Sequence, residues 1–179
     1  MKYDIGLIMK YVFEYDAGIP KSLALGFSVA VCAFVVVLSV VKADNILLVR
    51  RVSWSLLLGY VLLVLCFTVF FREGKDVAQI SMKPLWNYES LNYKLIAESI
   101  LNVFLFMPIG FLAGAAVRNR RMLTVLGIGL FISFSIEVMQ YVFQRGVCNI
   151  DDLMHNVLGC FIGYSLFALC SLMFWKKRI

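Results

Sequence analysis

Long apolar stretches alternate with short polar segments along most of the chain. A helix rises about 1.5 Å per residue, so about 20 apolar residues cross the roughly 30 Å hydrocarbon core of a bilayer. Five stretches are long enough, at residues 19–41, 53–71, 99–117, 122–143 and 153–175. The pattern therefore predicts an all-α, polytopic membrane protein, a bundle of about five transmembrane helices.

The start of the chain follows a different pattern. Apolar positions such as Ile8 and Val12 are interrupted by charged ones, and the run is too short to span a bilayer. Such a mixture favours a helix that lies in the membrane interface. We expect an N-terminal interfacial segment, residues 1–18, followed by one membrane domain, residues 19–179. The 19–41 run is longer than a signal-peptide core, so we expect it to remain as an anchor.

The composition agrees with this class and the charge distribution orients the helices. The chain is 62% hydrophobic and 16% charged, with a mean hydropathy of +0.88, outside the range of soluble domains. If five helices alternate, nine basic residues share one side: Lys42, Arg50, Arg51, Arg118, Arg120, Arg121, Lys176, Lys177 and Arg178. The positive-inside rule makes that side cytoplasmic, with the N-terminus outside and the C-terminus in the cytoplasm. The net charge of +6 thus reflects the orientation of the protein in the membrane, together with some attraction to anionic lipid head groups, and it requires no nucleic-acid partner.

Polar groups interrupt the last two spans. On the 122–143 helix, helical spacing places Ser133, Glu137, Gln140, Tyr141 and Gln144 on one face. On the 153–175 helix the same spacing groups Asp152, His155, Asn156, Gly159 and Gly163. A short loop normally joins antiparallel neighbours, so we expect Glu137 and Asn156 at similar depth. Charged groups at this depth normally face the interior of a bundle.

Other features predict how the remaining elements meet this polar region. Asp151 or Asp152 is placed to cap the last helix. The repeats at residues 110–114 and 159–163 both read G-x-x-x-G, a spacing that lets membrane helices approach closely, and predict contact between the third and fifth spans. The 72–98 loop, with aromatic residues suited to the head-group level, is either a roof over the polar region or a simple interfacial loop.

The polar positions form a combined motif. It reads Asn102-Val-Phe-Leu-Phe-Met-Pro108-Ile-Gly110-Phe, then Glu137-x-x-Gln140, Arg145 and Asp151-Asp152-Leu-Met-His-Asn156-Val-Leu-Gly159. Over about residues 68–170 it resembles the VanZ-like family, named for a membrane protein associated with teicoplanin resistance. Arg72 stands where that family carries an arginine, whereas Asn149 replaces a usual aspartate and His155 a usual apolar residue. The resemblance implies a multi-pass protein of the bacterial plasma membrane with a link to glycopeptide susceptibility.

One hypothesis is an outward-facing polar pocket that binds, or as a variant modifies, an envelope lipid, a lipid-linked cell-wall precursor or a glycopeptide. Its expected ligand-binding residues are Arg72, Asn102, Glu137, Gln140, Arg145, Asp151, Asp152 and Asn156. Arginine binds phosphate or carboxylate through paired hydrogen bonds, and the best catalytic candidates are Glu137 and Asp152, since a carboxyl group can act as general acid or base. No nucleophile paired with a base is recognisable, so enzymatic activity stays open.

The alternative hypothesis is a non-catalytic scaffold or partner-binding protein in which the polar cluster holds the helices together. Interhelical polar contacts stabilise membrane proteins by about 1 kcal/mol each, which suits Gln140, Asn102 and Asn156. It suits Glu137 less well, because a neutral glutamine would avoid the cost of a buried charge. The five scattered cysteines show no disulfide framework or thiolate site, and we expect neither a metal nor a cofactor. A transporter fits poorly without inverted repeats.

Overall fold

The computed structural model describes residues 4–14, 33, 45–70, 79–89, 92–117 and 121–175. Its elements are α1 (Ile5–Glu14), α3 (Ile46–Leu65), the π-helix η1 (Cys66–Phe70), β1 (Gln79–Ser81), α4 (Trp86–Glu89), α5 (Tyr93–Ala116), α6 (Met122–Val142), β2 (Val147–Asn149) and α7 (Ile150–Trp175). Four helical stretches within this part of the chain are long and apolar enough to cross a membrane: Ile46–Phe70, Tyr93–Ala116, Met122–Val142 and Ile150–Met173. They confirm the polytopic helical fold. The predicted 19–41 span and Arg72 lie outside the described residues.

Three of the four described spanning helices begin earlier than hydropathy predicted, and the difference is largest for α3 and α5. The prediction started them at residues 53 and 99, whereas α3 begins at Ile46 and α5 at Tyr93. Asparagine side chains set both starts: Asn45 accepts the Leu48 N–H at 3.0 Å, and Asn92 accepts the Lys94 N–H at 3.1 Å. Capping side chains decide where a helix starts, while hydropathy registers only its apolar part.

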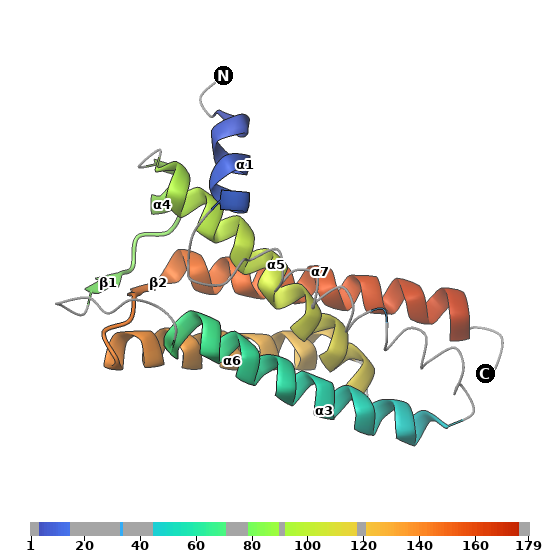
Figure 1. Ribbon diagram of the computed structural model, residues 1–179. Helices are drawn as coiled ribbons and strands as arrows, with labels where there is room; N and C mark the ends of the chain where they lie inside the picture. Colours follow the sequence, from blue (N-terminus) through green and yellow to red (C-terminus); the bar gives the residue numbers. More distant parts are fainter. Residues whose placement is uncertain are drawn as a thin grey trace.

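α5 is the central helix and packs against α1, α3, α6 and α7. Figure 1 shows α5 slanting across α3, α6 and α7, with β1 and β2 together where α6 ends and α7 begins. We call the end where β1 and β2 lie the strand end of the bundle. The opposite end, the arginine end, carries Arg50, Arg51 and Arg121. Each long helix therefore runs from one end to the other, as consecutive membrane spans do.

Glycines allow α5 and α7 to pack with their backbones in contact. A Cβ on Gly110 would overlap the Cys160 carbonyl oxygen, and a Cβ on Gly163 would overlap that of Met107. A Cβ on Gly159 would likewise meet a main-chain oxygen of α5. The predicted contact between these two helices through the G-x-x-x-G repeats is confirmed.

The short helix α1 docks on the first turns of α5. Ile8 and Val12 form a small apolar cluster with Ile96 and Ala97. Figure 1 shows α1 lying crosswise to the long helices, near α4. The apolar positions of α1 therefore pack on the protein, while its placement in the membrane interface stays a prediction.

Candidate functional site

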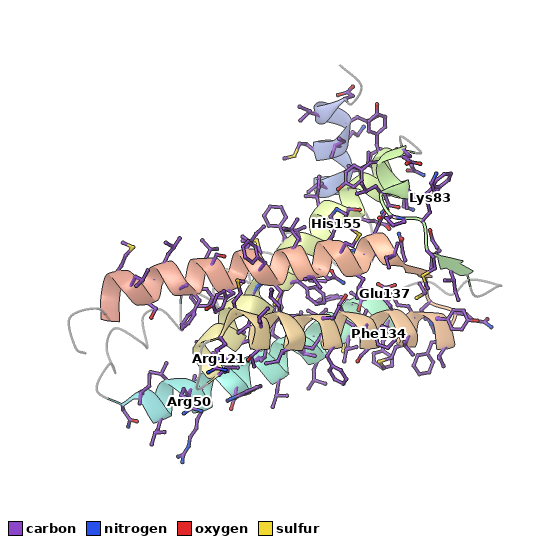
Figure 2. The ribbon with its side chains drawn as sticks, turned by 180° about the vertical axis from the view of Figure 1, so that it is seen from behind. Arg50, Lys83, Arg121, Phe134, Glu137 and His155 are labelled. Atoms are coloured by element: carbon purple, nitrogen blue, oxygen red, sulfur yellow. The ribbon has the colours of Figure 1, made fainter. Side chains whose placement is uncertain are left out.

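One face of α6 carries buried polar side chains. Ser133, Glu137 and Gln140 expose 0%, 4% and 3% of their surface. Figure 2 shows Glu137 pointing from α6 toward α7. The prediction that five residues share one buried face of this helix is correct for these three and wrong for Tyr141 and Gln144. Tyr141 is 40% exposed, and Gln144 lies beyond the end of α6 with a φ of 54°. The helical turn ends at that point, so the spacing argument no longer applies.

The Glu137 carboxylate is held at the start of the following segment. Its Oε2 accepts the N–H of Asn149 at 2.9 Å. Asn149 in turn accepts the N–H of Asp151 at 3.0 Å through its side-chain oxygen, which makes it the N-cap of α7. The prediction that Asp151 or Asp152 caps this helix was wrong, because α7 already begins at Ile150 and both acids lie inside its first turn. The asparagine directly before the helix was the available signal.

Asp151 binds a different segment of the chain. Its side chain is fully buried, and its two oxygens accept the N–H of Leu85 at 2.5 Å and of Asn87 at 3.0 Å. The carboxylate thereby caps α4, which follows Leu85, a residue with a φ of 60°. The Asn87 side chain donates to the Ser99 hydroxyl at 2.9 Å and accepts from Asn149 at 3.4 Å. This network attaches the 79–89 segment to α5 and α7.

Sequence reasoning missed Asn87 and Ser99. Neither stands out by spacing, because their partners lie on other elements. The parallel pairing of β1 with β2, which sets Ser81 beside Asn149, completes the attachment. The described part of the 72–98 loop thus lies over the strand end.

His155 joins the same network through its ring nitrogens. Nδ1 lies 2.5 Å from the Asp151 carbonyl oxygen, and Nε2 lies 2.7 Å from the Tyr88 hydroxyl. The two rings also stack, with centroids 5.7 Å apart. A carbonyl oxygen only accepts, so Nδ1 carries a proton in this arrangement. The histidine links α7 to α4.

Two buried amide side chains, by contrast, are only half satisfied. Asn156 donates to the Ser133 hydroxyl at 2.8 Å, and Gln140 donates to the Thr68 carbonyl of η1 at 3.0 Å. Their oxygens, Asn156 Oδ1 and Gln140 Oε1, have no hydrogen-bond partner among the described residues. A buried acceptor without a partner costs about 1–3 kcal/mol. These two oxygens therefore mark places where a donor is missing.

The depth predicted for Asn156 needs a correction. It pairs with Ser133, one helical turn deeper in the bundle than Glu137. The reason is that the connection after α6 folds back over the helix end. Asn149 rather than Asn156 therefore lies level with the Glu137 carboxylate.

The other predicted residues that the structure describes differ in burial and in hydrogen bonding. Asp152 is 9% exposed on α7, and the Arg145 N–H donates to the Gln140 carbonyl oxygen at 2.8 Å. Asn102 is half-buried on α5 and takes no part in the hydrogen bonds described above. Over the described ranges, no group of three or more His, Cys, Asp or Glu side chains is placed to hold a metal ion.

The pKa of the Cys148 thiol, in β2, depends on the charges around the site. Burial raises the pKa of its thiol, and the nearby carboxylates of Glu137 and Asp152 raise it further. Both carboxylates thus raise the pKa of the same thiol.

These site residues lie in a region with known relatives. The model of the VanZ/LLP1 family matches residues 57–172, which include η1, the strand-end network and most of the four long helices. The chain belongs to the VanZ/LLP1 family. The chain is similar to Protein VanZ of Enterococcus faecium, with 26% identity over 131 residues that cover 69% of this chain and 78% of that protein. No solved structure matches it. The resemblance drawn from the motifs is confirmed.

The site of this VanZ-family membrane protein has two parts with different chemistry. In the capping network, Asn87, Asn149 and Asp151 bind other parts of the protein. In the acceptor set, defined as Glu137, Gln140 and Asn156, two amide oxygens still lack donors within the described structure. The capping network, to which Glu137 is bonded through Asn149, accounts for architecture. The side-chain oxygens of Gln140 and Asn156 have capacity left for a hydrogen-bond donor.

Proposed function

We propose that this VanZ-family protein binds the polar head of an envelope lipid, or of a lipid-linked cell-wall precursor, between α6 and α7. One observation carries the proposal: Gln140 and Asn156 are buried among apolar helices, yet their side-chain oxygens lack hydrogen-bond donors within the described structure. In lipid surroundings water does not readily satisfy such groups. A bound head group with hydrogen-bond donors would supply what is missing.

The position of the site suits a head group. Glu137 lies five residues before the end of α6 at Val142, or about 8 Å along the helix axis. The site is therefore near the level where lipid head groups meet the hydrocarbon. Arg145 follows α6 directly, and its guanidinium is of the kind that binds phosphate. Asp152, Asn102 and Arg72 remain proposed ligand-binding residues.

The proposal includes the orientation of the bundle. Arg50, Arg51 and Arg121 gather at the arginine end, and Arg50 Nε donates to the Ala116 carbonyl at the last turn of α5. By the positive-inside rule this end faces the cytoplasm, and the strand end, with the site, faces outward. The N-terminus is then outside and the C-terminus cytoplasmic.

A scaffold function is the second candidate, and Asp151 favours it. Both of its oxygens accept backbone N–H groups of the 79–89 segment, so this acid acts within the protein. The scaffold hypothesis predicts that all the polar residues behave like Asp151. The binding hypothesis predicts that Glu137 differs from it.

The test compares Glu137→Gln and Arg145→Ala with wild type in a teicoplanin-susceptibility assay and by mass spectrometry of lipids that co-purify. Glutamine keeps an oxygen to accept the Asn149 N–H, so the protein should still fold. We expect both variants to lose the susceptibility effect and the bound lipid. Glu89→Gln, the same change at an exposed position near the strand end, is the matched control and should behave as wild type. Wild-type behaviour of both site variants would contradict the proposal.

A further inference from the structure

The 79–89 segment has a polar side chain inside and apolar side chains outside. Its Asn87 side chain is 1% exposed, whereas four large apolar side chains are 44–66% exposed: Ile80, Met82, Leu85 and Trp86. We call these four side chains the outer face of the segment. A segment surrounded by water normally has the opposite arrangement, and an exposed apolar patch marks contact with a membrane or with another protein.

The backbone of the segment finds hydrogen-bond partners within the protein. The N–H groups of Leu85 and Asn87 both donate to the buried Asp151 carboxylate, and β1 pairs with β2. Within hydrocarbon, backbone polar groups need partners in the protein, because no water is there to bind them. These contacts therefore lower the free-energy cost of placing the segment in lipid.

Two contacts set the depth of the segment along the bundle. Ser81 in β1 pairs with Asn149, whose N–H donates to the Glu137 carboxylate, about 8 Å before the end of α6. Asp151, which holds the start of α4, is the second residue of α7. Both α6 and the first turn of α7 belong to stretches that are long and apolar enough to cross a membrane. The segment therefore lies beside the ends of spanning helices and not beyond them.

The exposed apolar surface of the helices continues to this level. Phe70 of η1 and Phe143, which follows α6, are 57% and 52% exposed, with ring centroids 6.4 Å apart. Val142, the last residue of α6, is 64% exposed. Figure 1 shows β1 beside β2 at this same end of the bundle. A lipid layer that surrounds the helices up to these residues also reaches the outer face.

The charged side chains of the segment suit the polar edge of that lipid layer. The Lys83 ammonium lies 2.5 Å from a Glu89 carboxylate oxygen and 4.7 Å from the centre of the Trp86 ring. Tryptophan and lysine are common where head groups meet hydrocarbon, because the ring packs on the apolar side and the ammonium reaches the polar side. Since Glu89 offsets the charge of Lys83, the contact depends on apolar burial and does not require anionic lipid.

We infer that the outer face is embedded in the lipid leaflet at the strand end, with Lys83 and Glu89 at the level of the head groups. In the orientation proposed above this is the outer leaflet. The segment is then a cover with two attachments. Asn87 and the Asp151 contacts join it to the bundle, and the outer face joins it to the membrane. This inference goes beyond the proposed function and does not depend on what the site binds.

Trp86 is a probe of this contact. Its fluorescence is isolated by Trp54→Phe and Trp175→Phe, and the purified full-length protein is reconstituted in phosphatidylcholine vesicles with or without bromine on the acyl chains. Brominated chains quench a tryptophan that touches lipid, and iodide on both sides of the vesicles quenches one that faces water. Trp54, 39% exposed on α3 and isolated by Trp86→Phe and Trp175→Phe, is the matched control for lipid contact. Dissolved N-acetyltryptophanamide is the reference for water.

We expect brominated lipid to reduce the emission of Trp86 about as much as that of Trp54. Iodide should reduce it several-fold less than it reduces the emission of the dissolved reference. Where Trp54→Phe or Trp175→Phe prevents folding, the difference in emission between wild type and Trp86→Phe gives the same quantity without the other substitutions.

Two outcomes would overturn the inference. Quenching by iodide as strong as in the reference, without quenching by brominated lipid, would place the outer face in water. Quenching by neither would mean that protein covers Trp86, which in these vesicles is a second copy of the chain. Both outcomes leave lipid binding at the site untouched, because that proposal rests on Gln140 and Asn156.

Discussion

We expect the substitution Asp151→Asn to release the 79–89 segment from the strand end of the bundle. The Asp151 carboxylate is fully buried and accepts two backbone N–H groups, from Leu85 and Asn87. Asparagine has the same shape but only one acceptor oxygen. Its NH₂ group would face one of the two N–H donors, so that contact becomes repulsive and leaves a buried donor without a partner.

The structure sets the size of the effect. A hydrogen bond to a charged acceptor is worth about 1.5–3 kcal/mol, and Asp151→Asn removes one and weakens the other, a loss of about 2–4 kcal/mol. The control Glu89→Gln breaks an ion pair with Lys83 in which both side chains are more than half exposed. Such a pair contributes about 1 kcal/mol or less. The two changes are chemically alike and differ in burial.

Amide hydrogen exchange of residues 85–89, read by mass spectrometry of the purified protein, measures the release. A loss of about 2–4 kcal/mol in local stability lowers protection by about 30- to 1000-fold. Protection in Glu89→Gln should stay near that of wild type. If these amides are as well protected in Asp151→Asn as in the control, the contact with Asp151 does not hold the 79–89 segment on the bundle.

Two further predictions concern the helix packing and the charge at the strand end. Gly163→Ala should destabilise the protein by about 1–3 kcal/mol, because its Cβ would overlap the Met107 carbonyl oxygen. Gly127→Ala, with no atom within 4 Å of its Cβ, should leave the thermal unfolding temperature unchanged; equal unfolding temperatures would refute the close packing. Since burial, Glu137 and Asp152 raise the pKa of Cys148, labelling of intact cells by an impermeant maleimide should be slow at pH 7 and speed up about tenfold per pH unit toward pH 9. The other cysteines are replaced for this assay; a flat pH profile, or labelling only after lysis, would contradict the charge or the orientation.

Local patterns in the chain were enough to predict the elements of the fold. Runs of apolar residues located the four spanning helices, since crossing a bilayer requires a fixed length of apolar helix. Helical spacing predicted the buried face formed by Ser133, Glu137 and Gln140, and the glycine repeats predicted that α5 touches α7. Each of these features depends on residues close together in the chain. The combined motif, whose residues are distributed over several of these elements, was also sufficient to recognise the family.

Only the tertiary structure decided which polar groups meet. Asn87 bonds to Asn149, and Leu85 to Asp151, although more than 60 residues separate each pair. No periodicity encodes such pairs, because they form only when the 79–89 segment folds over the end of the bundle. The same folding divides residues that look alike in sequence. Both side-chain oxygens of Asp151 accept backbone N–H groups in the folded protein. The side-chain oxygens of Gln140 and Asn156 have no donor within the described structure, since a hydrogen bond depends on where the partner lies in space.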